Sequence, residues 1–269
     1  FSMFTSESVF PGHPDRICDQ ISDSILDYCI EYDSESRVAV ETMVCPDRVI
    51  VAGEITTKAD IDYEYVARET VKSIGYVHDG LGFRYDTFKF VNHIHQQSPD
   101  ISMGVNTGGA GDNGLIFGGA CRETDSFMPL SITICRTLER NFRRLCFVKQ
   151  KEFGVLFRPD GKSQVTIDQT GKNPIVKCVV FNVQTTENAE KAGEYRELIT
   201  KLVIKPTLES FNLNTDCVIY INPTGKFVVG GPFGDCGVTG RKIIAATYGG
   251  YYRHGGGAQS GKDPTKVDK

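Results

Sequence analysis

The sequence contains no tryptophan and no uninterrupted apolar run of about 18 residues, the length that a membrane-spanning helix needs. Its first four residues lead directly into polar residues, a pattern that predicts no secretory signal. An excess of positive charge is also missing, since the net charge is −4 and the pI is about 5.8. Because proteins that bind nucleic acid or anionic membranes usually carry a basic surface, we expect no nucleic acid and no membrane among its partners.

The nine cysteines are odd in number and are never spaced as CxxC. These features argue against a disulfide framework and against a zinc site, and they favour the reducing cytosol, so we predict a cytoplasmic location. The chain has 269 residues, of which 40% are hydrophobic and 24% charged. This is the composition of a soluble globular protein, at a length that allows two domains.

Glycine is concentrated in the last forty residues, Gly230–Lys269, which hold eleven of the 28 glycines. Basic side chains alternate with them: Arg241, Lys242, Arg253, Lys262 and Lys266. Glycine lets backbone N–H groups approach a ligand closely, and basic side chains balance the charge of phosphate oxygens. The combination predicts a binding segment for a polyphosphate, whereas a flexible linker would favour serine and glycine without clustered cations.

One stretch of this segment, Gly256–Asp263, nearly matches the P-loop pattern. Asp263 stands where a serine or threonine would bind magnesium, and Tyr251–His254 precedes the stretch in place of a hydrophobic strand. We therefore expect a phosphate-binding segment that is not a P-loop.

Hydrophobic periodicity predicts the same order of elements twice along the chain. The first set comprises a helix beginning at Pro14, a hairpin of Arg37–Cys45 and Arg48–Thr56, a helix over Asp60–Ile74 capped by Gly75, and a strand over Thr87–Ile94. The second set comprises a helix over Pro129–Leu145, a hairpin of Lys162–Gln169 and Ile175–Gln184, a helix over about Glu187–Leu208, and a strand over Cys217–Asn222. A further strand over Lys226–Val229 and a short helix over Thr239–Tyr248 follow.

These patterns predict an α+β fold of repeated helix–hairpin–helix–strand units, each a sheet with helices on one face. We expect a first unit over residues 1–125, a second over 126–229, and a glycine-rich phosphate-binding segment, 230–269, that packs back on the first unit. Within the first unit, 96–114 is polar, glycine-rich and without periodicity, which predicts a lid or binding loop, with disorder as the alternative.

His13 and Asp15 flank the expected start of the first helix, where backbone N–H groups point outward and attract anions. His13 is a candidate donor to a phosphate or sugar oxygen, and the alternative is a simple helix cap. Asp15 is a candidate ligand for a divalent cation, and the alternative is plain complementarity to the helix dipole.

Glu41 and Glu54 place charges inside otherwise apolar strands, so each needs a cation, an amine or an arginine unless its face is solvated. Gly53 beside Glu54 allows something to approach closely. Asp160 and Asp235 each precede or lie near a glycine in an expected turn, and Asp235 comes shortly before Arg241 and Lys242.

Seven motifs along the chain, in order, resemble those of the S-adenosylmethionine synthetase (methionine adenosyltransferase) family. They are GHPD at Gly12–Asp15, GEIT at Gly53–Thr56, QSPDI at Gln97–Ile101, GAGD at Gly109–Asp112, RPDGKSQV at Arg158–Val165, GGPFGDCGVTGRKI at Gly230–Ile243 and HGGGAQSGKDPTKVD at His254–Asp268. The two longest are highly specific.

The resemblance implies that the sulfur of L-methionine attacks C5′ of ATP and displaces triphosphate, which is then hydrolysed to pyrophosphate and phosphate. It also implies two Mg²⁺ ions per site and K⁺, and self-association as a dimer or tetramer with active sites at the dimer interface. A thioether has no proton to lose, so the leaving group is the difficulty and its stabilisation must be electrostatic.

The resemblance assigns roles to particular residues of this sequence. His13, Lys162, Arg241 and Lys262 take catalytic positions. ATP is bound by His13, Asp160, Lys162, Lys226, Phe227, Asp235, Arg241, Lys242, Ala258 and Lys262. Methionine is bound by Glu54, Gln97, Asp235 and Lys266, magnesium by Asp15 and Asp268, and potassium by Glu41.

The chain departs from the family pattern at several positions, where Pro11, Arg16, Asn113, Lys226 and Gln259 stand for other usual residues. The expected lid is also shorter than usual. Because none of these changes removes a charged residue assigned above, a competent enzyme is favoured. The alternatives are an inactive nucleotide-binding regulatory paralogue and a kinase-like phosphotransferase, which the failed P-loop pattern opposes.

The family arrangement is pseudo-threefold, and its third unit follows the KVD motif, at the point where this sequence stops. We therefore expect the natural protein to be longer by about one unit, and residues 1–269 alone to aggregate and to be inactive, because a missing unit exposes apolar faces of the other two.

Overall fold

The computed structural model describes residues 3–96 and 114–268. They divide into two compact units. The unit that contains helix α1, here called the α1 unit, comprises the described residues of 11–117, 231–243 and 253–268. The unit that contains strand β1, the β1 unit, comprises 3–10, 118–230 and 244–252. Both units combine helices with a mixed sheet, so the prediction of an α+β fold is confirmed.

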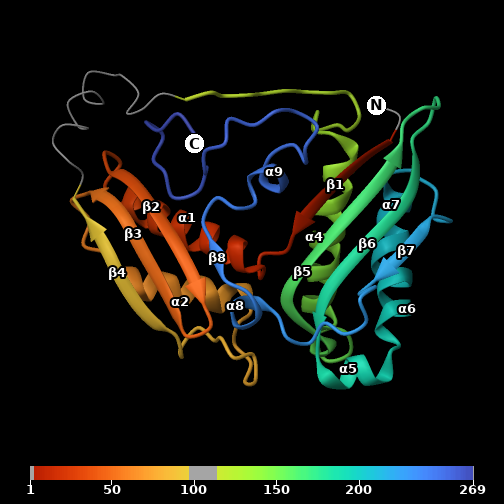
Figure 1. The fold of residues 1–269 in the computed structure, drawn as a ribbon, viewed down its shortest axis with the longest axis horizontal. Coiled ribbons are helices and arrows are strands. Elements are labelled where there is room, and N and C mark those ends of the chain that lie inside the picture. Colours follow the sequence, from red (N-terminus) through yellow and green to blue (C-terminus); the bar gives the residue numbers. More distant parts are fainter. Residues whose placement is uncertain (1–2, 97–113, 269) are drawn as a thin grey trace. The chain divides into compact units, whose positions relative to one another are not determined.

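The sheet of the α1 unit has the strand order β4-β3-β2-β8. Its elements are α1 (Pro14–Tyr32), β2 (Arg37–Cys45), β3 (Arg48–Thr56), α2 (Tyr63–Ile74), β4 (Lys89–His95), α8 (Gly231–Gly234) and β8 (Gly237–Val238). Strands β3 and β4 are parallel, and β2 is antiparallel to both β3 and β8. Figure 1 shows α1 and α2 on one face of this sheet.

The core of the α1 unit lies between that sheet face and the two helices. Ile17, Ile21 and Ile25 recur every four residues on α1 and are fully buried, as the periodicity predicted. They pack with residues such as Val38 and Val40, which alternate along β2 with outward-facing side chains. Helix α2 begins three residues later than predicted, because the Asp62 side chain accepts the Tyr65 N–H at 3.0 Å and caps the helix there.

The sheet of the β1 unit has the strand order β1-β5-β6-β7, in which only β6 and β7 are parallel. Its elements are β1 (Met3–Val9), α4 (Leu130–Val148), η1 (Gly154–Leu156), β5 (Phe157–Asp168), β6 (Ile175–Thr185), α5 (Glu187–Ala192), α6 (Tyr195–Ile199), η2 (Thr200–Ile204), α7 (Lys205–Ser210) and β7 (Val218–Ile221). The short helix α9 (Ile243–Ala246) follows β8 in the sequence.

Aromatic side chains form the centre of the β1 unit. The Phe142 ring of α4 lies 5.0–5.7 Å, centroid to centroid, from the rings of Phe10, Phe153, Phe157 and Phe181. All five are at least 96% buried. Figure 1 shows α4 on the same sheet face as α6 and α7, so this aromatic cluster fills the space between helices and sheet.

Apart from shifts at the ends of elements, three predicted elements differ from the observed ones. The predicted helix over Glu187–Leu208 is interrupted, because Gly193 adopts a left-handed conformation at φ 73° and ends α5. The helix then passes through a π-helical turn, Thr200–Ile204, just before Pro206, which has no N–H to continue the regular pattern.

The predicted strand over Lys226–Val229 is wrong, since these four residues, all described, form no strand. The Thr185 N–H donates to the Phe227 carbonyl at 2.8 Å. This hydrogen bond fixes the stretch in place of the repeated hydrogen bonds of a β-strand pair. The predicted helix over Thr239–Tyr248 is reduced to α9, because its first residues instead extend and hydrogen-bond to β2. No helix in the described part of the chain is long and apolar enough to cross a membrane.

Candidate active site

The start of helix α1 is fixed by its cap and by the loop before it. The Nδ1 atom of His13 accepts the Asp15 N–H at 3.1 Å, and Pro14 occupies the first turn. The Tyr76 hydroxyl, which is fully buried, donates to the Gly12 carbonyl at 2.6 Å. His13 therefore caps the helix through Nδ1 and is held at the positive end of the helix, where an anion is favoured.

Asp15 is almost fully buried, with 2% of its surface exposed, beside two cations of the glycine-rich segment. Its Oδ2 atom lies 2.7 Å from Lys242 Nζ, and its Oδ1 atom lies 3.6 Å from Arg241 Nη1. Oδ1 also accepts the Val238 N–H at 3.0 Å. Burial opposes ionisation, but the contacts with Lys242 and Val238 outweigh it and hold the pKa of Asp15 below its usual value. Asp15 is thus a carboxylate that balances Lys242.

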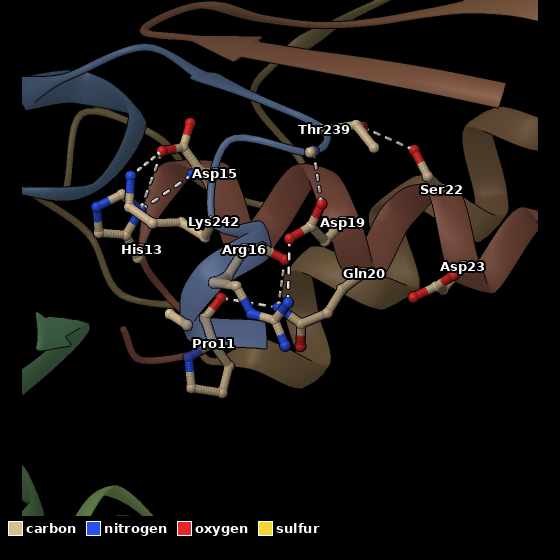
Figure 2. A network of polar contacts seen from close by, with 12 residues as sticks. Pro11, His13, Asp15, Arg16, Asp19, Gln20, Ser22, Asp23, Thr239 and Lys242 are labelled. Atoms are coloured by element: carbon tan, nitrogen blue, oxygen red, sulfur yellow. Dashed lines mark hydrogen bonds and ion pairs between the residues drawn. The ribbon is translucent and has the colours of Figure 1, made fainter. Parts of the chain in front are cut away.

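Asp15, Asp19 and Asp23 form an acidic stripe at four-residue spacing on α1 (Figure 2). Each accepts a backbone N–H of the glycine-rich segment: Asp15 from Val238 at 3.0 Å, Asp19 from Gly240 at 2.9 Å, and Asp23 from Gly261 at 2.9 Å. The stripe therefore holds the backbone that carries Arg241, Lys242 and Lys262.

Asp19 lies in the middle of the stripe and is 5% exposed. Burial raises its pKa more than the Gly240 N–H and the nearby Arg16 guanidinium lower it, and Asp23 adds repulsion. Arg16 Nη1 donates to Asp19 Oδ2 at 3.0 Å. Within the acidic stripe, Asp15 is thus stabilised as a carboxylate by its partners, whereas burial makes ionisation of Asp19 unfavourable.

Buried hydroxyl groups join the same segment to β2. Ser22 Oγ lies 2.8 Å from Thr42 Oγ1 and 3.0 Å from Thr239 Oγ1. The Thr42 N–H donates to Thr239 Oγ1 at 2.9 Å, and the Thr239 N–H donates to the Thr42 carbonyl at 3.0 Å. These bonds explain why Thr239 extends along β2 instead of starting a helix.

The stretch that nearly matches a P-loop is also built onto β2. The Val40 N–H donates to the Gly261 carbonyl at 2.9 Å, and the Asp263 N–H donates to the Val38 carbonyl at 3.0 Å. The Asp263 side chain, fully buried, accepts the Val38 N–H at 2.7 Å and pairs with Lys266. Asp263 is therefore a structural anchor, and no strand lies in the described residues 251–254, so rejecting the P-loop is confirmed.

Lys262 lies between two acidic side chains of the same unit. Its Nζ atom is 3.0 Å from Asp268 Oδ2, and its charge also acts on Glu41 of β2. The surrounding protein desolvates the Glu41 carboxylate and raises its pKa despite Lys262, and Asp19 and Glu54 raise it further. Glu41 shares the outer face of β2 with Met43, which is 39% exposed.

Glu54 lies on β3, and its Oε1 atom is 3.4 Å from Nε2 of His95 on β4. Its side chain is 40% exposed. The neighbouring Gly53 has φ 132°, and a Cβ atom there would lie 2.1 Å from the Ala39 carbonyl oxygen. The predicted close approach at Gly53 is real, and what approaches is the backbone of the adjacent strand.

Other residues predicted for the site lie in the α1 unit as well. Asp235 follows α8 and is exposed, with its N–H donating to the Gly231 carbonyl at 3.1 Å. Ala258 packs against Gly240, where a Cβ atom would lie 2.5 Å from the Ala258 Cβ. Gln97 and almost all of the expected lid, 97–113, lie outside the described residues.

The remaining candidates lie in the β1 unit. Asp160 and Lys162 are in β5, at an irregularity in its pairing with β6, so the predicted turn at Asp160 is wrong. A Cβ atom on Gly161 between them would lie 2.6 Å from the Phe10 ring, which explains the glycine. Lys226 Nζ pairs with Glu187 Oε1 at 2.8 Å, and the Phe227 carbonyl accepts the Thr185 N–H at 2.8 Å.

Sequence reasoning missed Asp19, Asp23 and Thr239, which hold the basic segment in place. The acidic spacing of the first two was readable, since DRICDQISD repeats aspartate every four residues from Asp15. Their partners were not readable, because they are backbone N–H groups more than 200 positions away.

Comparison with known proteins identifies the family. Models of the N-terminal, central and C-terminal domains of S-adenosylmethionine synthetase match residues 2–99, 107–227 and 229–269. The S-adenosylmethionine synthase of Fusobacterium nucleatum is 50% identical over 272 residues, covering 100% of this chain and 70% of that protein. The synthases of Brachyspira hyodysenteriae and Mycoplasma capricolum are each 47% identical, covering 99% of this chain and 70% and 69% of their own lengths.

The chain belongs to the S-adenosylmethionine synthetase family. The resemblance seen in the seven motifs is thereby confirmed. S-adenosylmethionine synthetases are generally metal-dependent enzymes.

Among the residues that the structure describes, no three His, Cys, Asp or Glu side chains converge on a metal position. Mg²⁺ is commonly held by one or two protein carboxylates, with substrate phosphates and water completing its octahedron. Asp15 and Asp268 fit that mode, since a lysine ammonium group lies 2.7 Å from the first carboxylate and 3.0 Å from the second. A metal ion would replace the lysine as countercharge.

Proposed function

We propose that the chain transfers the adenosyl group of ATP to the sulfur of L-methionine, with release of triphosphate that is hydrolysed to pyrophosphate and phosphate. Family membership supports this function, and the observation that carries it is the cluster at the start of α1. There His13, Arg241 and Lys242 gather around the helix N-terminus and Asp15. A departing triphosphate needs this combination of helix end and cations.

The roles of the residues follow from the charge that develops in the reaction. The sulfur of methionine is the nucleophile and needs no base, so catalysis consists of positioning and of stabilising the leaving oxygen. We assign His13, Lys162, Arg241 and Lys262 to the leaving triphosphate. ATP is further held by Asp160, Lys226, Phe227, Asp235, Lys242 and Ala258.

Lys242 and Lys262 are preset for this task. Each is paired with a carboxylate, Asp15 and Asp268 respectively, which keeps the ammonium group ordered before phosphate arrives. With phosphate bound to the lysines, Asp15 and Asp268 would be the residues that hold two Mg²⁺ ions. Bound Mg²⁺ would supply further positive charge to the phosphate oxygens.

Methionine is held by Glu54, Asp235, Lys266 and Gln97, with Glu54 facing the ammonium group. Glu54 Oε1 lies 3.4 Å from Nε2 of the His95 imidazole, so its carboxylate is within reach of a nitrogen group. Glu41 is assigned to K⁺, because its carboxylate is partly desolvated and has acidic neighbours whose charge a cation would offset.

At the level of assembly, we propose a cytoplasmic homo-oligomer, a dimer or tetramer, whose active sites lie at the dimer interface. We also propose that the two α+β units and the glycine-rich phosphate-binding segment are parts of a pseudo-threefold arrangement. The supporting observation is that β2-β3-β4 and β5-β6-β7 each consist of an antiparallel hairpin followed by a parallel strand.

Product analysis of the complete natural protein tests the function. With ATP and methionine we expect S-adenosylmethionine, pyrophosphate and phosphate in equal amounts. ADP as the product would indicate a phosphotransferase. Nucleotide binding without any product would indicate the inactive regulatory alternative, which no observation on this chain favours. Omission of methionine is the control for unrelated ATP hydrolysis.

A further inference from the structure

We propose that Cys45 and Cys236 are a dithiol site that forms a reversible disulfide and anchors the segment 231–243 to β2. The pairing comes from the register of β8 against β2. Met43 lies opposite Val238 and Val44 lies opposite Gly237 in this antiparallel pair. Continued by one residue beyond the end of β8, this register places Cys45 opposite Cys236.

The two cysteines occupy a pair position at which the strands come closest. Thr239 N–H donates to the Thr42 carbonyl at 3.0 Å, which marks Thr42 and Thr239 as a hydrogen-bonded pair. Hydrogen-bonded and non-hydrogen-bonded pairs alternate along an antiparallel ladder, so Cys45 and Cys236 form a non-hydrogen-bonded pair. Such pairs have Cα atoms about 4.5 Å apart, within the range of about 4.4–6.8 Å that disulfides use.

Both side chains lie on the outer face of the sheet. Cys45 follows Glu41 and Met43 at two-residue spacing on β2, and Cys236 is exposed. Burial of Cys45 raises its pKa, and the nearby Cys236 raises it further, so the two thiols are close to each other. Cys45 Sγ now lies 3.9 Å from the Arg48 carbonyl oxygen, so rotation about the Cα–Cβ bond is needed to turn it toward Cys236.

The other cysteines provide an internal contrast, and all nine lie in the described part of the chain. Cys29 and Cys135 are fully buried, so a peroxide in solution cannot reach their thiols. Cys178 and Cys217 are also neighbours. There the parallel register pairs Cys178 with Val218, so Cys217 is offset by one residue and faces the opposite side.

The chemistry needs an oxidant of the peroxide class. Hydrogen peroxide transfers one oxygen atom to the exposed Cys236 thiol, which gives a sulfenic acid and one water. The Cys45 thiol then attacks that sulfur and gives its proton to the departing hydroxide, so that the S–S bond and a second water form. Two molecules of a small thiol reverse the step and leave as their own disulfide. A disulfide at an exposed sheet edge is of the labile kind that occurs transiently in reducing compartments.

The test uses the complete natural protein, hydrogen peroxide as the probe, and rapid alkylation before mass spectrometry. We expect a peptide linked through Cys45 and Cys236 that dithiothreitol removes. We also expect amide hydrogen exchange across 231–243 to slow about tenfold or more in the oxidised protein. Cys45→Ser and Cys236→Ser each abolish both effects, whereas Cys178→Ser leaves both intact.

Several outcomes would overturn the proposal. One is Cys236 oxidised to sulfinic acid while Cys45 remains open to alkylation. Another is a link between Cys178 and Cys217 in place of the expected one. A linked peptide with unchanged exchange across 231–243 would refute the anchoring. If Cys45→Ser does not fold, Cys45→Ala serves in its place, since alanine adds no polar group to the strand.

Discussion

Each of the two units is stabilised internally by a different kind of contact. The β1 unit is centred on five phenylalanine rings around Phe142. The α1 unit has an aliphatic core, but its glycine-rich segment is attached through carboxylates and hydroxyl groups. Apolar packing is insensitive to charge, whereas ion pairs can be exchanged for a charged ligand. The candidate active site is thus built from the contacts that a polyphosphate can replace.

The apolar side of this comparison can be broken at the aromatic cluster. Phe142→Ala should lower the free energy of unfolding by about 3–5 kcal/mol, because it removes a fully packed ring and leaves a cavity. Urea unfolding of the complete protein measures the loss. Phe147→Ala, on the same helix but 85% exposed, is the matched control and should change little. Equal effects of the two substitutions would contradict the central place of Phe142.

The polar side can be broken at the helix start. His13→Ala should slow adenosyl transfer by raising its activation free energy by about 3 kcal/mol. This is the usual cost of losing one donor aimed at developing negative charge. ATP binding should change far less, because such a donor acts chiefly in the transition state. Steady-state kinetics and equilibrium ATP binding measure the two effects. His93→Ala, an exposed histidine of β4, is the control.

An unchanged turnover number with a raised KM would mean that His13 does not stabilise the leaving triphosphate.

The anchor of the glycine-rich segment gives a third test. Asp263→Asn keeps the size of the side chain but removes the charge that pairs with Lys266 and accepts from Val38. We expect a loss of about 1.5–3 kcal/mol in the free energy of unfolding, as for hydrogen bonds to charged groups. Asp60→Asn, exposed in the same unit, is the control and should be neutral. A neutral Asp263→Asn would mean that β2 holds the segment without this carboxylate.

A smaller effect is expected at the methionine pocket. Glu54→Gln should weaken methionine binding about tenfold, since a charge-assisted hydrogen bond becomes a neutral one. This loss is at the low end of the usual range for a charge-assisted hydrogen bond, because the Glu54 side chain is 40% exposed without ligand. ATP binding should be unchanged, and calorimetric titration with each substrate separates the two. Equal losses for both substrates would place Glu54 outside the pocket.

Acidification provides the finest test of the comparison. The pKa of Asp263 is lowered, because its contacts with Lys266, Thr265 and Val38 outweigh burial. Its stabilising contribution is therefore present above the ordinary value of 3.8 and is lost as pH falls through the lower folded pKa. We expect the difference in free energy of unfolding between wild type and Asp263→Asn to shrink in that window.

Asp19 has the opposite sign, because burial raises its pKa. Its ionisation opposes folding above the folded pKa, and acidification relieves that cost. Asp19→Asn should therefore make the acid-induced loss of stability steeper, whereas Asp263→Asn makes it shallower. Urea unfolding at a series of pH values checks both, and parallel pH profiles would contradict the assigned shifts.

Local patterns in the sequence predicted much of the fold. Strands β2 and β3 have the predicted ends, because alternation and the Pro46-Asp47 turn are local signals. The interrupted helix after Glu187 was not predicted, since hydrophobic spacing continues through a π-helical turn. The strand expected at Lys226–Val229 failed because a tertiary contact with Thr185, not alternation, decides its conformation.

The candidate site divides in the same way. Motifs identified His13, Asp15, Lys242 and Lys262, yet their pairings depend on contacts between distant parts of the chain. Asp263 was judged only as a defect in a P-loop, although it is a buried anchor. Nothing local in the sequence distinguishes a carboxylate that binds a metal from one that binds a backbone N–H.

The acidic stripe also constrains the order in which the protein can fold during synthesis. Its three hydrogen bonds to Val238, Gly240 and Gly261 span 223, 221 and 238 positions of the chain. A ribosome adding about 5–20 residues per second needs tens of seconds or less to bridge that separation. During this interval α1 exposes unneutralised carboxylates and β2 has an open edge. Until its last segment emerges, the nascent α1 unit therefore lacks both the N–H partners of the acidic stripe and the strand that covers β2.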